Sequence, residues 1–255
     1  MIRPRPFVAA LIGLVSVAAL LLLGPLATTS TAAARGTDPL AGAPTVGECH
    51  KLTLKGLYKK SDSSRKVRCS REHTSRVVKV LQLPDGVGWN ASNDKLTRIA
   101  TRKCRPSWEK TLGGTYRSRD MTSYSSAWFM PTAAQRDRGA RWFSCHLVLW
   151  GGSSSLAPLP TDKVPALGAL PHPDNVAACL TKQARTTCQR KHIWRATGNL
   201  VVDKNKFPGD RALRRAAIRR CPAQVSTDQF VWTYRSSILW NMGDHVVVCY
   251  SKTRR

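Results

Sequence analysis

Acidic residues are scarce in this chain of 255 residues, which has 15 Asp and Glu against 41 Lys and Arg and a net charge of +26. Glutamate occurs only at Glu48, Glu72 and Glu109. Hydrolysis of a glycan requires two carboxylic acids across a cleft, and no two acids here form a recognisable signature. The sequence also has no Gly-rich phosphate loop, no Gly-x-Ser-x-Gly elbow and no His-Glu-x-x-His pair, so the common signatures of NTPases, serine hydrolases and zinc proteases are missing.

Long hydrophobic runs are missing too, except at the N-terminus. There Arg3 and Arg5 precede an apolar stretch, residues 7–23, and Ala32–Ala34 supply the small residues at which signal peptidases cut. This order is typical of a secretory signal peptide, assigned here to residues 1–34. The stretch is long for such a peptide, so an uncleaved signal anchor is the alternative. We expect the mature chain to be secreted or otherwise extracytoplasmic and associated with the cell envelope.

Cysteine, by contrast, is present in an even number, and the eight residues fall into two groups of four. In an exported chain this predicts disulfides. A segment with five prolines and no cysteine separates the groups and predicts a semi-rigid linker. The expected organisation is a short linker at 35–45, a first domain at 46–150, the Pro/Gly/Ser linker at 151–174 and a second domain at 175–255. The cysteines are Cys49, Cys69, Cys104, Cys145, Cys179, Cys188, Cys221 and Cys249.

The two groups repeat one pattern, which indicates a tandem duplication rather than two unrelated domains. Each contains a Cys-x-Arg-x-His box, and in each a tryptophan precedes the last cysteine by 17 positions (128 to 145 and 232 to 249). An aspartate follows that tryptophan in both copies. The repeated positions, which we expect to serve the fold, are His73, His192, Trp128, Trp232, Asp137 and Asp244.

Local patterns predict two similar small α+β domains, each roughly β-β-α-β-β. The third cysteine of each group falls on the apolar face of a helix, where a disulfide would join helix to sheet. Four cysteines allow three pairings, of which we favour first with second and third with fourth. The expected strands are 76–83, 142–150, 193–202 and 244–250, and the expected helices are 93–105, capped by Asn93 or Asp94, and 210–221.

These residues resemble the septum-formation domain family of actinobacteria. Val46-Gly47-Glu48-Cys49 opens the first copy, and Cys69-Ser70-Arg71-Glu72-His73 is its box. The second copy is divergent, with a shorter first loop, so a ligand of that loop would belong to the first copy only. The resemblance implies an extracytoplasmic role linked to cell division or the envelope, and it implies no known reaction.

The Cys-x-x-x-His boxes have a functional alternative, either a Cys/His nucleophile or a Cys3His zinc site. A nucleophile must be a free thiolate, and even pairing of eight cysteines leaves none. Structural zinc sites usually bring closely paired ligands, whereas the other cysteines lie far from each box and no Cys-x-x-Cys occurs. We therefore predict disulfides with a structural histidine, and no catalytic residue, metal or cofactor.

Basic charge is concentrated in the two domains: 21 Lys and Arg against eight acids give +13 in the first, and 16 against four give +12 in the second. Such one-sided charge favours an anionic cell-wall polymer or membrane surface as partner. Division proteins are further candidate partners. Export argues against nucleic acid, and no small-molecule substrate is evident. The predicted function is an exported, non-enzymatic envelope protein in septum formation or cell division; the alternative is a cell-wall hydrolase with a dispersed carboxylate pair. The predicted anion-binding surface comprises Arg98, Arg102, Arg105, Arg211, Arg214, Arg215 and Arg219.

Overall fold

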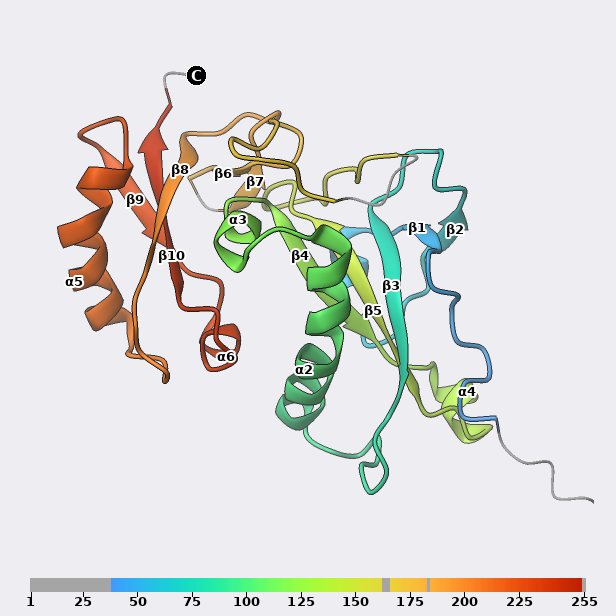
Figure 1. Ribbon diagram of the computed structural model, residues 1–255. Helices are drawn as coiled ribbons and strands as arrows, with labels where there is room; N and C mark the ends of the chain where they lie inside the picture. Colours follow the sequence, from blue (N-terminus) through green and yellow to red (C-terminus); the bar gives the residue numbers. More distant parts are fainter. Residues whose placement is uncertain (1–37, 162–165, 183, 254–255) are drawn as a thin grey trace, which may run out of the picture. The chain divides into compact units, whose positions relative to one another are not determined.

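The computed structural model describes residues 38–161, 166–182 and 184–253 (Figure 1). The predicted signal segment, 1–34, lies outside the described residues. Within the described ranges, no helix has the length and apolarity needed to cross a bilayer.

The first half is a five-stranded antiparallel sheet with the order β2-β1-β3-β5-β4. Its main helix, α2, packs on β3, β4 and β5. The strands are β1 (Cys49–Lys51), β2 (Arg65–Val67), β3 (Ser75–Gln82), β4 (Tyr124–Phe129) and β5 (Trp142–Leu149). The helices are α1 (Leu54–Leu57), α2 (Asn93–Leu112), α3 (Tyr116–Asp120) and α4 (Ala133–Asp137).

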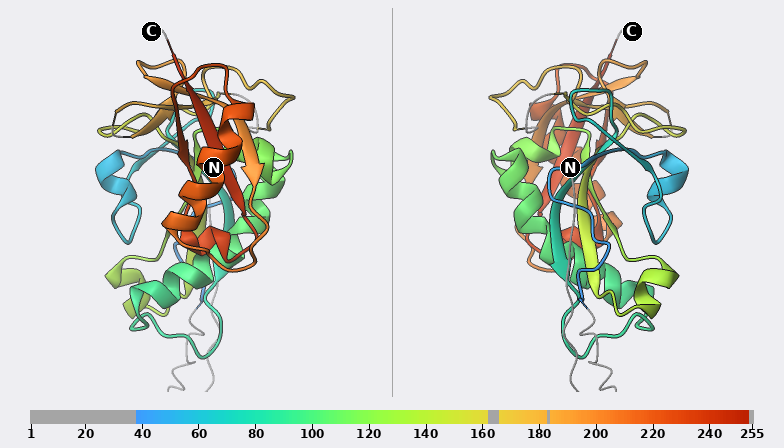
Figure 2. Two further views of the ribbon diagram at one scale, coloured as in Figure 1. Left: turned by 90° about the vertical axis from the view of Figure 1, so that its left-hand side faces the viewer. Right: turned by 90° about the vertical axis from the view of Figure 1, so that its right-hand side faces the viewer.

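The second half repeats this topology strand for strand, in the order β7-β6-β8-β10-β9. Its main helix, α5, again connects the third and fourth strands and covers the sheet in the left view of Figure 2. The elements are β6 (Ala178–Leu180), β7 (Arg185–Thr187), β8 (Trp194–Val201), α5 (Asp210–Arg220), a 3-10 turn η1 (Cys221–Gln224), β9 (Phe230–Thr233), α6 (Ser237–Trp240) and β10 (Val246–Lys252). The predicted α+β class with two similar halves is confirmed. Each sheet has one strand more than predicted, because three strands precede the helix.

Helix α2 is longer than the predicted helix, which ended at Arg105. It begins after Ser92, whose side chain accepts a hydrogen bond from the N–H of Lys95, so the N-cap is Ser92 rather than Asn93 or Asp94. It continues through Pro106 to Gly113, which ends it with a φ of 64°. The extension adds two buried side chains to the apolar stripe, which becomes Leu96, Ala100, Cys104, Trp108 and Leu112.

The four disulfides pair as favoured from the sequence, first with second and third with fourth in each half. The first pairing joins neighbouring strands or turns, and the second joins the main helix, or the turn that follows it, to the last strand. Because the sheets are small, these crosslinks supplement modest cores. The pairs are Cys49–Cys69, Cys104–Cys145, Cys179–Cys188 and Cys221–Cys249.

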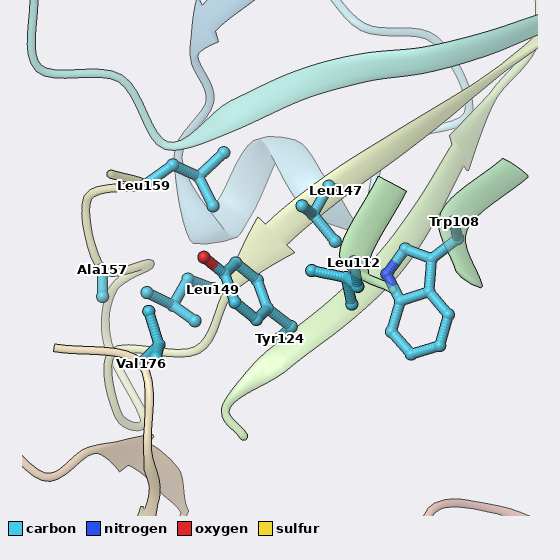
Figure 3. Close-up of a cluster of buried hydrophobic side chains, with 8 residues drawn as sticks. All are labelled: Trp108, Leu112, Tyr124, Leu147, Leu149, Ala157, Leu159 and Val176. Atoms are coloured by element: carbon cyan, nitrogen blue, oxygen red, sulfur yellow. The ribbon is translucent and has the colours of Figure 1, made fainter. Parts of the chain in front are cut away.

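The segment predicted to be a linker packs against the first half. Ala157 and Leu159 are buried in one cluster with Tyr124 and Val176, the last of which belongs to the second half (Figure 3). The Leu159 N–H donates to the carbonyl of His73 at 2.8 Å. The described residues belong to one compact unit, and this segment is packed within it.

Candidate functional site

The predicted anion-binding arginines of α5 are exposed, whereas Leu213 and Ala217 turn inward. Ile218, which is 53% exposed, lies among them. None of the four forms a salt bridge within the ranges that the structure describes. The outward face of α5 is thus a basic surface with one apolar residue, and no carboxylate of the described residues lies within salt-bridge distance of the four arginines. These arginines are Arg211, Arg214, Arg215 and Arg219.

On α2, Arg98 and Arg102 are exposed as predicted, but Arg105 is not a free surface cation. Its Nε donates to Glu109 Oε1 at 2.7 Å, and its Nη1 donates to the carbonyl of Met242 in the second half. The helix extension past Pro106 explains the difference, because it places Glu109 one turn after Arg105. Arg105 connects the halves instead of joining the surface.

The two Cys-x-Arg-x-His boxes form equivalent turns. Nδ1 of His73 donates to the carbonyl of Arg71 at 2.9 Å, and Nδ1 of His192 donates to the carbonyl of Arg190 at 2.7 Å. Both rings are buried. Each histidine therefore closes the turn between its disulfide and the following strand, which is a role in the fold.

Trp128 and Trp232 also occupy equivalent places. In the sheets, Trp128 lies opposite Cys145 and Trp232 lies opposite Cys249. Both rings pack against the core cluster that contains the helix-to-strand disulfide of their half. The two strands that carry the tryptophan and the last cysteine are antiparallel neighbours. The 17-residue spacing is therefore the length of chain needed to turn between them and place the cysteine beside the tryptophan.

The two repeated aspartates, in contrast, have different surroundings. Asp137 is exposed at the end of α4. Asp244 follows α6, is partly buried and lines a cavity of about 620 Å³. A duplicated position has thus acquired a different environment in each half.

This cavity is lined by residues of both halves. Thr97, Thr101 and Trp108 of α2 contribute, as does Trp150 just after β5. Thr233, Arg235 and Asp244 contribute from the second half. Its volume is within the range of about 300–1,000 Å³ that is usual for small-molecule sites.

A buried ion pair in the lining of this cavity connects the halves. Arg235 Nε donates to Asp120 Oδ1 at 2.5 Å, and the two side chains are 6% and 2% exposed. The other guanidinium nitrogens donate to the carbonyls of Tyr124 at 2.6 Å and Arg119 at 2.9 Å. The guanidinium carbon also lies 5.4 Å from the centre of the Trp108 ring. These three hydrogen bonds of the buried guanidinium thus all go to the first half.

Asp244 adds a second carboxyl group beside Asp120. Burial, reinforced by the charge of Asp120 beside it, raises the pKa of Asp244 to about 7. Buried Asp120 Oδ2 and Asp244 Oδ1 form no hydrogen bond within the described residues. The second half thus brings a carboxyl group with a raised pKa next to the ion pair that joins the halves.

A second charged cluster lies at the first loop, beside a smaller cavity of about 370 Å³. His50 Nδ1 is 3.2 Å from Asp62 Oδ2, and its Nε2 is 3.5 Å from Glu48 Oε2. The bond to Asp62 raises the pKa of His50 against the effect of burial. Burial opposes ionisation of Asp62, but its bonds to His50 and Ser64 lower its pKa to about 2. An ion pair therefore holds the loop to β1.

The buried His146 lies behind this cluster, between the hydroxyls of Ser75 and Ser144 at 2.8 and 2.9 Å. Burial lowers its pKa to about 3, so the ring is neutral. Counted from the equivalent cysteines, the second half has Leu180 in place of His50 and Tyr250 in place of His146. This cluster is therefore particular to the first half, as is the long loop that it holds.

The sequence pointed to Arg105 and Asp244 among the residues of the inter-half cavity, but it missed the others. Asp120 and Arg235 are 115 positions apart and carry no local pattern. Arg235 has no counterpart in the repeat that could have drawn attention to it. The signals that the sequence does carry are the repeated position Asp244 and the arginine-rich face of α2, to which Arg105 belongs.

Comparison with family models matches the chain to the family described as Septum formation, over residues 46–249. The chain belongs to the septum-formation family. The match runs through both halves and the segment between them. No curated protein and no solved structure matches the chain. The family supports a general role in septum formation and cell division and is not a known enzyme family. Together with four disulfides it fits an extracytoplasmic protein.

Proposed function

We propose that this septum-formation protein is an exported, non-enzymatic component of the cell envelope that binds anionic wall or membrane components. The observation that carries the proposal is the outward face of α5, where four exposed arginines have no acidic partner among the described residues. Cations near an anionic surface contribute about 1 kcal/mol each. The excess charge of both domains adds a longer-ranged attraction.

The alternative of nucleic-acid binding has less support. Base stacking requires accessible aromatic rings, whereas Trp128 and Trp232 pack against disulfides in the cores. The N-terminal segment predicted to direct export would also separate the chain from cytoplasmic nucleic acid.

A binding experiment with two charge variants tests the proposal. The purified oxidised chain is pelleted with vesicles of phosphatidylglycerol and phosphatidylcholine, with pure phosphatidylcholine vesicles, and with isolated walls before and after removal of their phosphate-bearing polymers. Replacing Arg211, Arg214, Arg215 and Arg219 by Gln should weaken retention on an anionic target at least about tenfold, and added salt should weaken retention of the wild type. The preferred target distinguishes wall from membrane.

The matched control removes the same charge elsewhere, with Gln at Lys55, Lys59, Lys60 and Lys79, all of which are exposed. It should lose much less affinity than the α5 variant. Equal losses would assign binding to total charge rather than to α5. The proposal would be contradicted if added salt did not reduce retention. It would also be contradicted if neutral vesicles and stripped walls retained the protein as well as anionic vesicles and intact walls do.

A further inference from the structure

The cavity between the halves has a lining that the basic helix faces do not explain. Four hydroxyl groups of the lining form no side-chain hydrogen bond within the described part of the chain: those of Thr97, Thr101, Tyr116 and Ser126. Each hydroxyl can donate one hydrogen bond and accept others. They come from α2, α3 and β4, so three elements contribute unpaired hydroxyls to one lining.

Aromatic surface accompanies these hydroxyls. Trp108 and Trp150 both line the cavity. Trp108 is 8% exposed, and its buried indole Nε1 has no acceptor in the described structure. A buried N–H without a partner costs free energy, and Trp and Tyr rings combine an apolar face with a polar edge.

Three of the cations that line the cavity are committed to carboxylates of the same lining. Glu109 Oε1 binds Arg105 Nε at 2.7 Å and Arg119 Nη2 at 3.2 Å, and Arg235 binds Asp120. Lys182 and Arg185 also line the cavity and form no salt bridge among the described residues. Beside α2 and β4, an anionic ligand would have to compete with the carboxylates, and an apolar ligand would leave the hydroxyls without partners. That part of the lining is best matched by an uncharged ligand that is rich in groups able both to donate and to accept.

We infer that this cavity is a carbohydrate-binding site that takes a short, uncharged glycan segment, with hydroxyls on α2 and β4 bonding to the sugar and tryptophan rings packing on its apolar faces. The site differs in place and chemistry from the arginine face of α5 and does not depend on the anion binding proposed for it. Both halves line the site, so it exists only in the joined molecule.

Calorimetric titration of the oxidised chain tests this inference. The probes are a trisaccharide of β-1,4-linked N-acetylglucosamine, cellotriose, and an uncharged tetrapeptide. We expect saturable binding of at least one trisaccharide. Thr101→Phe, which fills the cavity from α2, should weaken that binding at least about tenfold. Lys103→Phe, two residues along the same helix on an exposed position outside the cavity, should leave it within about twofold.

Ser126→Phe on β4 is a second blocking variant, used if Thr101→Phe does not give the wild-type unfolding midpoint. The inference is overturned if neither trisaccharide binds up to about 10 mM, above the millimolar range of weak specific binding. It is equally overturned if the folded blocking variants bind sugar as the wild type does, or if the tetrapeptide alone binds. Loss of vesicle or wall retention in the α5 variant has no bearing on these outcomes.

Discussion

At the scale of single residues, burial decides what each charged group does. Arg195 pairs with Asp174 at 2.6 Å and Arg235 with Asp120 at 2.5 Å, but the first pair is 31% and 47% exposed and the second is 6% and 2% exposed. Water screens the first pair, whereas the second would leave a buried charge uncompensated if broken. The two pairs have the same chemistry, but breaking the buried pair should cost much more stability than breaking the exposed one.

Replacing Arg235 by Met should therefore reduce the free energy of unfolding by about 3–5 kcal/mol, because Asp120 and two carbonyls lose their donor. Arg195→Met is the matched control and should cost about 1 kcal/mol or less. Urea unfolding of the three proteins measures both values. Similar losses in both variants would show that Arg235 is not the link between the halves that its contacts indicate.

The pH dependence of stability should reveal Asp244. Its pKa is about 7 in the folded protein, mainly through burial, against an ordinary value of 3.8. The folded state therefore favours the protonated form, so the stability contributed by this group is present below about pH 4 and is lost as the pH rises through 7. Asp120, Arg235 and Arg105 are the charged groups that act on it.

Asp244→Asn keeps the carboxyl position uncharged and should remove this loss. We expect the variant to exceed the wild type at pH 8 by at least about 1.4 kcal/mol, the equivalent of one pKa unit, with little difference at pH 4. Asp137→Asn, at the repeated but exposed position, should follow the wild-type curve. If the free energy of unfolding depended on pH in the same way for Asp244→Asn and the wild type, the assigned pKa would be contradicted.

At the scale of elements, local sequence patterns predict the main helix and the two long strands of each half. The 3.6-residue apolar stripes identified α2 and α5, and the β-branched runs identified β3, β5, β8 and β10. The strands β2 and β7 escaped prediction because each has three residues with mostly polar side chains, Arg65–Val67 and Arg185–Thr187. The end of α2 was misplaced because tertiary packing of Trp108 and Leu112 outweighs the break expected at Pro106.

The disulfides differ in the length of chain that they close, 41 residues for Cys104–Cys145 and nine for Cys179–Cys188. Loop-closure entropy predicts losses of about 4 and about 2.5 kcal/mol when each pair is replaced by alanines. Denaturant unfolding of the two double variants measures the difference. A larger loss for Cys179–Cys188 would contradict a mainly entropic role.

At the scale of the whole molecule, the two halves share cores that neither copy could complete alone. Met121 of the first half is buried with Ala178 and Val246 of the second. Arg117 Nε donates to Asn199 Oδ1 at 2.7 Å across the same boundary. These contacts join distant positions without any periodic pattern, so the sequence could not predict the cavity between the halves.

The central claim, that the basic face of α5 brings this septum-formation protein to an anionic envelope surface, is tested most directly in dividing cells. The measurement is fluorescence localisation of the tagged full chain with fractionation of wall, membrane and cytoplasm, for the wild type, the four-Gln α5 variant and the lysine control. The account predicts that the wild type and the control concentrate at septa and in an envelope fraction, and that the α5 variant is released from it. An α5 variant located like the wild type, or a wild type found in the cytoplasm, would contradict it.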